Sequence, residues 1–232
     1  MCGRYASVRS VDDLASTYGV SGDDVDELPP ADWNVAPTKS VAAVLVRHGR
    51  LALTTLRWGL VPAWSDTADG GTTMFNARIE TVHERRAFRD SIRHRRCLLP
   101  ADGWYEWRRL PDGRRVPHFL TSQDGGVVSF AGVWDAWRDG EGRWLRSTAI
   151  LTGTALGDLS LVHDRAPVVL DRATWSAWLD PDTEVDEVTA MLQPTRPDLI
   201  EFWPVRDLVG DVRANGPQLA EPVTLDEQPP LF

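Results

Sequence analysis

The chain has 232 residues, of which 42% are hydrophobic and 25% charged, a composition ordinary for a globular protein that buries a core without disulfides. A formal net charge of −9 argues against a protein coated in nucleic acid. No apolar run approaches the roughly 20 residues that span a bilayer, and no basic segment followed by an apolar stretch opens the chain, so we expect a cytoplasmic protein.

The expected elements of the first half are a capped helix (10–19), an irregular proline-rich stretch (26–39), two strands around a turn (40–62), a polar loop (66–71) and a basic helix (84–95). The second half continues with two strands around a Pro-Asp-Gly turn (97–122), a hairpin (126–155), two short helices (171–180 and 185–193) and a strand-like segment (201–212).

Strands outnumber helices in this sequence and meet through tight turns. That pattern predicts an α+β fold, mainly an antiparallel sheet or partly closed barrel with peripheral helices. Because no repeat or linker is evident, we expect a single domain over residues 1–232. Its core would span about residues 2–222, followed by an acidic, proline-containing C-terminal tail.

Positive charge is concentrated between Arg78 and His118, where eleven arginines face six acidic residues. Lys39 is the only lysine among 25 basic residues. Arginine suits bidentate phosphate contacts, although a genome-wide preference for arginine codons explains the bias equally well. We therefore expect at most a short basic groove, for a partner that offers few phosphates.

Neither a disulfide nor a metal site is expected. Cys2 and Cys97 are the two cysteines, and in a reducing compartment both would be free thiols. No histidine stands at ligand spacing with a cysteine or another histidine. The five histidines are His48, His83, His94, His118 and His163.

Four segments combine a reactive or polar residue with turn residues: CGRY (2–5), FNARIET (75–81), PADGWYEW (100–107) and LVHDRAPVVL (161–170). They contain Cys2, Asn76, Glu106 and His163. Each of the last three also has a structural interpretation: a turn-stabilising amide, a solvated carboxylate and a hydrogen-bonded core histidine. On a strand, Glu106 points away from its aromatic neighbours, so it faces either solvent or a pocket.

Cys2 directly follows Met1, and aminopeptidases normally remove a methionine that precedes so small a residue. The new N-terminus would carry an amine and a thiol on neighbouring carbons, with ordinary pKa values of about 8 and about 8.5. The alternative is a frayed N-terminus without a function.

Together these segments resemble the SRAP family, the SOS response-associated peptidase-like proteins that process abasic sites in single-stranded DNA. The resemblance runs from Cys2 to about Pro222. It rests on MCGRY, WNVAPT, RWGLVPAW, FNARIET, RCLLPADGWYEW, AGVWD, HDRAPVVL and WPVRDLVGDVRANGPQL, in that order.

The resemblance implies that Cys2 traps the ring-opened aldehyde of an abasic site. An amine and an adjacent thiol would close on that aldehyde, through a Schiff base, to a thiazolidine, whereas an internal cysteine would form only a reversible hemithioacetal. By resemblance, Asn76 holds the Cys2 terminus and polarises the sugar. Glu106 acts as acid and base during imine formation, and His163 promotes ring opening and assists reversal.

The resemblance also implies contacts to DNA. The candidates are Arg4, Arg78 and Arg165 for phosphates, Asn34, Pro37 and Trp64 for neighbouring bases, and Thr152 for the backbone. Core packing of Trp64 and an ion pair between Arg165 and Asp164 are the alternatives. Three departures from the family pattern, Ser65, Leu156 and Ala166, put DNA affinity and local geometry in doubt.

The leading hypothesis is an abasic-site sensor that cross-links to single-stranded DNA and shields the lesion during replication and the DNA damage response. It would carry associated lyase and self-reversal activities. An N-terminal-nucleophile peptidase that removes its own leader is one alternative, and a non-catalytic single-strand binder is another. We expect a monomer without cofactor or membrane partner, associated with the nucleoid when engaged on DNA; protein partners at a replication fork stay open.

Overall fold

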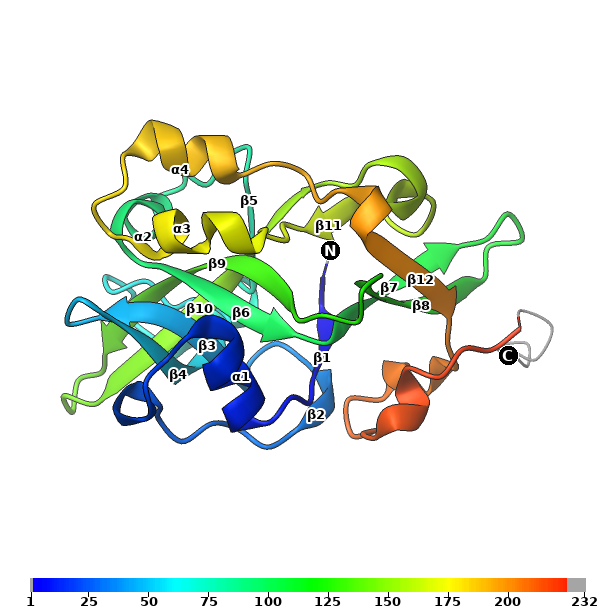
Figure 1. Cartoon of the computed structure of the whole chain (residues 1–232), viewed down its shortest axis with the longest axis horizontal. Helices are drawn as coiled ribbons and strands as arrows, with labels where there is room; N and C mark the ends of the chain where they lie inside the picture. Colours follow the sequence, from blue (N-terminus) through cyan, green and yellow to red (C-terminus); the bar gives the residue numbers. More distant parts are fainter. Residues whose placement is uncertain (1, 225–232) are drawn as a thin grey trace.

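The computed structural model describes residues 2–224 and has the α+β fold that the sequence predicts (Figure 1). Its strands are β1 (Arg4–Ser7), β2 (Asp32–Val35), β3 (Ser40–Arg47), β4 (Arg50–Trp58), β5 (Asn76–Arg78), β6 (Arg96–Ala101), β7 (Gly103–Arg109), β8 (Arg115–Ser122), β9 (Val128–Arg138), β10 (Trp144–Thr154), β11 (Arg165–Pro167) and β12 (Ile200–Pro204). Its α-helices are α1 (Val11–Tyr18), α2 (Arg89–His94), α3 (Trp175–Leu179) and α4 (Val185–Met191).

Five strands close into a small barrel. β10 pairs with β4, β4 with β3, β3 with β6, β6 with β9, and β9 again with β10. Beyond the barrel, β10 also pairs with β5 and β11. The predicted barrel with peripheral helices is confirmed, and the parallel pairings of β10 with β4 and β5 go beyond the antiparallel arrangement that was expected.

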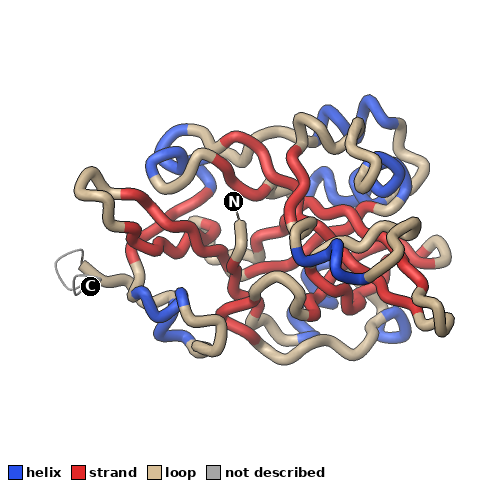
Figure 2. Tube along the Cα trace, turned by 180° about the vertical axis from the view of Figure 1, so that it is seen from behind, coloured by secondary structure: helices blue, strands red, loops and turns tan. Residues whose placement is uncertain are grey.

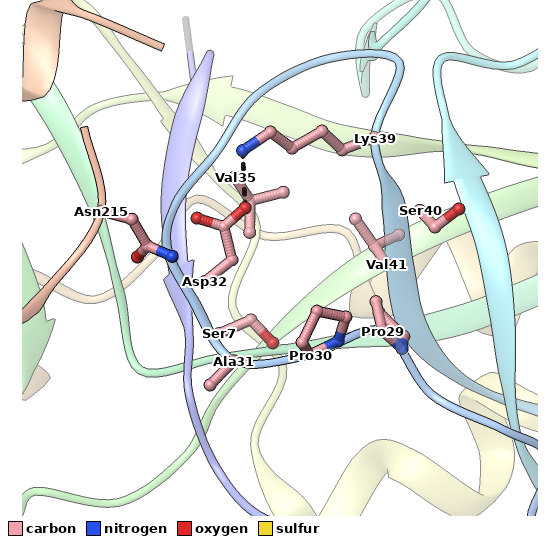
Figure 3. Close-up of a pocket in the computed structure, with 10 residues that line it drawn as sticks. All are labelled: Ser7, Pro29, Pro30, Ala31, Asp32, Val35, Lys39, Ser40, Val41 and Asn215. Carbon is pink, nitrogen blue, oxygen red and sulfur yellow. Dashed lines mark hydrogen bonds and ion pairs between the residues drawn. The ribbon is translucent and has the colours of Figure 1, made fainter. Parts of the chain in front are cut away.

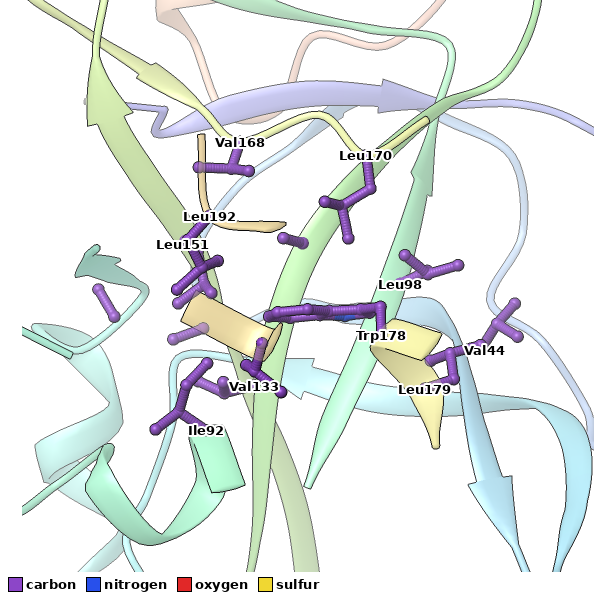
Figure 4. Close-up of a cluster of buried hydrophobic side chains, with 14 of the residues drawn as sticks. Val44, Ile92, Leu98, Val133, Leu151, Val168, Leu170, Trp178, Leu179 and Leu192 are labelled. Atoms are coloured by element: carbon purple, nitrogen blue, oxygen red, sulfur yellow. The ribbon is translucent and has the colours of Figure 1, made fainter. Parts of the chain in front are cut away.

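Side chains alternate between the two faces of the barrel wall, as the period of a strand requires. On β3, Ala42 and Val44 join a cluster that includes residues of all four helices. Ala43 and Leu45 join a second cluster that contains no residue of those helices. The first cluster is therefore the outer core beneath the helices, with Trp178 at its centre (Figure 4), and the second fills the barrel.

A second sheet, in the order β12-β8-β7-β1-β2, lies across one end of the barrel (Figures 1 and 2). Tyr5 of β1 makes edge contacts with Trp58 and Phe130 of the barrel, at ring-centroid distances of 5.2 and 5.8 Å. Because β1 is packed on the barrel and paired on both edges, the chain immediately before it is held in the interior.

Four element predictions are wrong in detail. The stretch 26–39 contains β2, which forms because β1 offers it a pairing edge. Residues 97–122 form three strands rather than two, since the chain breaks at Asp102 before Gly103. A Cβ at Gly103 would lie 2.4 Å from the Leu120 carbonyl oxygen, so only glycine fits where β7 approaches β8.

The predicted helix over 84–95 is shorter than expected. Tight turns link Thr81 to Glu84 and Arg85 to Phe88, and α2 begins only at Arg89. These turns bring Phe88 into the outer core. The prediction of a continuous helix from residue 84 did not include them. The segment 201–212 is likewise only partly a strand, because β12 ends at Pro204 and a 3₁₀ turn covers Asp207–Gly210.

Two predictions concern the ends of the chain, namely the removal of Met1 and the acidic C-terminal tail. Met1, whose removal was predicted, and residues 225–232 of the acidic tail lie outside the described residues. The described part of the tail is tied back to β12 by the Val223 amide, which donates to the Pro204 carbonyl at 2.9 Å. Within residues 2–224, no helix has the length and apolar character needed to cross a membrane.

Replacing Trp178 with alanine should lower the free energy of unfolding by about 3–5 kcal/mol, because its buried indole fills the outer core and donates to the Cys97 carbonyl at 2.9 Å. Trp144→Ala is the matched control, since that indole is 65% exposed and should change stability by less than about 0.5 kcal/mol. Urea denaturation measures both, and equal losses would contradict the assignment of this core.

Candidate functional site

Cys2 lies two residues before Arg4, the first residue of β1, and is fully buried. Its carbonyl oxygen accepts a hydrogen bond from the Asn76 side-chain amide at 2.8 Å. Its thiol sulfur lies 3.9 Å from the carbonyl oxygen of Arg4. The residue predicted to act as the nucleophile is therefore held at both its backbone and its side chain.

Asn76 owes its position to strand pairing. It opens β5, which runs parallel to β10 with Asn76 opposite Ile150. Its Nδ2 atom is engaged by Cys2, whereas its buried Oδ1 atom has no hydrogen-bond partner within the described part of the chain. A buried acceptor without a partner is unfavourable, so a donor from a bound molecule would be favoured there.

Glu106 lies in β7, the strand beside β1, and is only 3% exposed. Its flanking aromatic residues, Tyr105 and Trp107, pack in a separate cluster on the other face of the sheet. The predicted facing is confirmed, and the carboxyl group faces the interior rather than solvent. Burial raises the pKa of Glu106 to about 7, and the negative charge of Asp164 adds to the effect.

The same burial acts on the Cys2 thiol. Its pKa is raised well above the ordinary value, first because the sulfur is desolvated and second because of the nearby charge of Glu106. The thiol therefore stays protonated near neutral pH, and in that form it is a weak nucleophile.

His163 follows a 3₁₀ turn (Gly157–Leu161) and precedes β11. Its Nδ1 atom lies 2.7 Å from an Asp164 carboxylate oxygen and 3.0 Å from the Arg165 backbone nitrogen. Burial lowers the pKa of His163, and the charge of Asp164 opposes that shift. In the neutral ring Nδ1 accepts the Arg165 N–H, whereas in the protonated ring Nδ1 donates to the Asp164 carboxylate.

A chain of contacts and charge interactions links the four candidates. Asn76 bonds to Cys2, Cys2 and Glu106 interact through their charges, and Asp164 acts on both Glu106 and His163. The sequence pointed to Asp164 only as a partner for Arg165. Its position directly after His163 was the available signal for a role at the imidazole.

Arg78, Arg165 and Arg4, the three predicted phosphate contacts, differ in the partners that their side chains have. Arg78 is exposed on β5, two residues after Asn76. Arg165 forms a bidentate ion pair with Glu80, at 2.6 and 3.0 Å, rather than the alternative pair with Asp164. Arg4 donates to the Asn34 side-chain oxygen at 2.8 Å and to the Val209 carbonyl at 2.7 Å.

Two of the predicted DNA contacts lack exposed surface. Asn34 is fully buried, and its amide donates to the carbonyl groups of Asp211 and Ala214. Thr152 is also fully buried, and its hydroxyl lies 3.4 Å from an Arg165 nitrogen. In this conformation both residues hold other parts of the protein, Asn34 the C-terminal segment and Thr152 the arginine.

Trp64 and Pro37 do reach the surface. Trp64 is 50% exposed, so the alternative of core packing is wrong, and the Arg86 guanidinium lies 4.2 Å from its ring centre. Pro37 is half-buried in the turn that leads to β3. An exposed indole with a guanidinium against one face can stack on an unpaired base.

Ser65, Leu156 and Ala166, which depart from the family pattern, lie close in sequence to Trp64, His163 and Arg165. The Ser65 carbonyl accepts the Trp137 indole N–H at 2.6 Å, which fastens the Trp64 loop to β9. Leu156 is 45% exposed just before the turn that leads to His163, and Ala166 is buried in β11. Cys97, the other free thiol, is buried in the barrel.

A separate hollow of about 280 Å³ lies beside the loop that leads to β3 (Figure 3). Its wall includes Asp32 and Lys39, which form an ion pair at 2.6 Å. None of the four catalytic candidates lines it. Between residues 2 and 224 no cluster of histidine, cysteine and acidic side chains is arranged to hold a metal ion.

The fold and site are those of a small α+β protein with a buried cysteine at position 2 beside a carboxyl group of raised pKa. Residues 1–212 match the family described as SOS response associated peptidase (SRAP), and the chain belongs to this family. The abasic site processing protein YoqW of Bacillus subtilis (strain 168) is 32% identical over 226 residues, which cover 95% of this chain and 99% of that protein. The abasic site processing protein HMCES of Mus musculus is 31% identical over 201 residues, which cover 73% of this chain and 56% of that protein.

Solved structures share the fold. A protein from Bacteroides thetaiotaomicron matches with a TM-score of 0.85 at 22% identity, covering 96% of this chain and all of that one. A protein from Bordetella bronchiseptica matches with a TM-score of 0.76 at 25% identity, covering 88% of this chain. These likenesses bear out the fold class expected from the sequence.

Glu106→Gln should become more stable relative to the wild type as the pH rises. The folded protein holds the Glu106 proton up to about pH 7, whereas the unfolded chain releases it near pH 4.3. Wild-type stability therefore falls through this window, and the difference from the variant should grow by on the order of 3 kcal/mol.

Urea denaturation at about pH 4 and about pH 8 measures this difference. Glu84→Gln, at an exposed position, is the control and should show no comparable trend. A stability difference for Glu106→Gln that does not change with pH would contradict the buried, protonated carboxyl group.

Proposed function

We propose that this protein processes abasic sites in single-stranded DNA and attaches covalently to them through Cys2. The observation that carries the proposal is the Cys2 backbone, held by Asn76 beside a Glu106 carboxyl group whose pKa is about 7. The names of the relatives, which are abasic site processing proteins, support the same substrate.

The reaction begins with the sugar. An abasic deoxyribose is mostly a closed hemiacetal, and its aldehyde appears only when the ring oxygen takes up a proton and the C1′ hydroxyl loses one. Asp164 lies against Nδ1 and stabilises a protonated His163 ring, so His163 can take the proton of the C1′ hydroxyl and deliver a proton to the ring oxygen. The unpartnered Oδ1 atom of Asn76 offers an acceptor for a sugar hydroxyl.

The α-amine of Cys2, freed by loss of Met1, adds to the aldehyde carbon and gives a carbinolamine. Loss of water from that carbinolamine needs a proton on the departing oxygen. Glu106 has a pKa of about 7, so it is partly protonated under the working conditions and can supply that proton. The product is an imine between the Cys2 nitrogen and C1′.

The thiol then closes the ring. Its sulfur adds to the imine carbon, the C=N π electrons move to nitrogen, and the thiol proton ends on that nitrogen with Glu106 as carrier. Aldehyde and cysteine thus become a thiazolidine and one water. The raised pKa of the Cys2 thiol favours this order, because the amine reacts first and the sulfur becomes nucleophilic only as its proton leaves.

The imine also accounts for the proposed lyase and reversal activities. Removal of a C2′ proton from the imine lets the 3′ phosphate leave, which cuts the strand. Reversal runs the closure backwards, with the ring nitrogen protonated and water added to the imine. Both steps need the same proton carriers, Glu106 and His163.

DNA contacts are assigned by exposure. We propose Arg78, Pro37 and Trp64 as phosphate and base contacts because they reach the surface, and Arg165, whose side chain is 13% exposed, as a phosphate contact once its pair with Glu80 opens. The hydrogen bonds of Arg4, Asn34 and Thr152 support a different use for these residues, as groups that position the N-terminal strand and Arg165.

A cysteine peptidase is the second candidate, because an N-terminal cysteine is also a nucleophile for amides. A peptidase needs a thiolate, and burial raises the pKa of the Cys2 thiol. The protein produced with a short leader ahead of Cys2 separates the candidates: self-release of the leader in purified protein would favour the peptidase.

Cys2→Ala should abolish the heat-stable adduct, because it lacks the thiol that closes the thiazolidine. Wild-type protein incubated with a single-stranded oligonucleotide that carries one abasic site should give a heat-stable adduct on a denaturing gel. Cys2→Ser keeps the amine but not the thiol, so it should give an adduct only after borohydride reduction. An adduct from Cys2→Ala that matches the wild type, or none from the wild type, would refute the proposal.

Glu80→Gln should strengthen binding to single-stranded DNA, because it weakens the bidentate pair that neutralises Arg165. One additional phosphate contact would steepen the dependence of log K on log salt by about 0.7. Fluorescence anisotropy over a salt series measures the slope. Glu84→Gln removes a charge from an exposed position nearby, and an equal effect of both variants would count against a specific role of Glu80.

A further inference from the structure

Two adjoining hollows lie at the end of β10 that is far from Asn76 and Cys2. The larger has a volume of about 620 Å³, and its wall includes Arg57, Trp134, Trp144 and Arg146. The smaller, of about 280 Å³, shares Trp134 and Arg146 and adds Arg47 and His48. We call the two together the distal groove.

The distal groove is basic on an acidic protein. The chain carries a net charge of −9, yet no acidic residue of the described chain lines either hollow. Asp26 lies nearby, where it pairs with both nitrogens of the Arg47 fork at 2.8 and 3.0 Å and accepts the Thr54 hydroxyl. Arg57 and Arg146 are the other guanidinium groups of the lining, and Arg146 lies close enough to Asp26 for its charge to help lower the pKa of that carboxyl group.

The two tryptophans of the groove, Trp134 and Trp144, lie on the hairpin formed by β9 and β10. Across β9 and β10, Arg138 lies opposite Trp144 and Ala136 opposite Arg146, so these side chains share one face. The Trp144 indole is 65% exposed, and the Arg138 guanidinium lies 5.4 Å from its ring centre. Trp134 packs against the barrel core and closes the groove from below.

An exposed indole set among guanidinium groups, with no acidic residue in the lining, fits a chain of flat rings joined by phosphates. Indoles stack on unpaired bases of any sequence, and arginines pair with the phosphates between them. A protein partner would need acidic groups placed opposite the arginines and an aromatic group placed opposite the Trp144 indole. The charge therefore favours a nucleic acid strand.

We infer that the distal groove binds single-stranded DNA away from the lesion, an inference that rests on the proposed function. Arg146 and Thr152 are six residues apart on β10, which corresponds to about 20 Å along an extended strand. A strand that occupies both places must therefore reach well beyond the abasic site. The groove would add affinity for long strands and leave the chemistry at Cys2 unchanged.

The test compares unmodified oligonucleotides of about 8 and about 30 nucleotides, measured by fluorescence anisotropy. Trp144→Ala should weaken binding of the long strand about fivefold or more and leave the short one unchanged. The double variant Arg57→Ala with Arg146→Ala should reduce the salt slope for the long strand by about 1.4. Arg172→Ala with Arg196→Ala, at exposed positions, is the charge-matched control.

Adduct formation with a short abasic oligonucleotide is measured in the same proteins, and it should be unaffected by the groove variants. That assay tests Cys2 alone, so a failure of the proposed chemistry is distinguished from a failure of the groove. The inference is overturned if Trp144→Ala binds the long strand like the wild type, or if the arginine pair and its control lose affinity equally. DNA binding that none of the groove variants changes would also overturn the inference, and it would indicate that the groove binds a protein instead.

Discussion

The pairing of β1 with β7 is the constraint on which the site depends. β1 lies between β2 and β7 and packs Tyr5 onto the barrel, so the short segment before it, Cys2 and Gly3, is held in place. Arg4 lies opposite Tyr105, and Glu106 follows in the same strand. One ladder of backbone hydrogen bonds thus brings Cys2 beside the Glu106 carboxyl group, and Asn76 secures the Cys2 carbonyl from the barrel side.

Burial then sets the protonation states. Glu106 keeps its proton to about pH 7, the Cys2 thiol keeps its proton above that, and His163 is held mainly neutral. These states suit an amine that attacks first, an acid that expels water and a thiol that closes last. A site built for direct thiolate attack would instead place a positive charge beside the sulfur.

Sequence patterns predicted much of this architecture. The cap at Ser10, the β3–β4 turn and the β9–β10 hairpin follow from local turn and capping chemistry, and alternation along β7 correctly turned Glu106 away from Tyr105. The four catalytic candidates came from motifs whose meaning depended on the family resemblance.

Long-range contacts were beyond the reach of those patterns. β2 exists because β1 pairs with it, and Arg165 is paired with Glu80 across 85 positions of sequence. Asn34 holds the C-terminal segment through a hydrogen bond to Asp211, 177 residues away, and no local sequence pattern predicts a partner at that distance. The distal groove likewise arises where β4 and the β9–β10 hairpin meet, and no single motif contains it.

The central claim is that the amine and the thiol of Cys2 both bond to C1′ of the abasic sugar. Tandem mass spectrometry of the cross-linked N-terminal peptide tests it most directly. The account predicts a peptide that begins at Cys2, carries the sugar with the loss of one water, and resists borohydride. A sugar attached to any other residue, or to a chain that still carries Met1, would contradict the account.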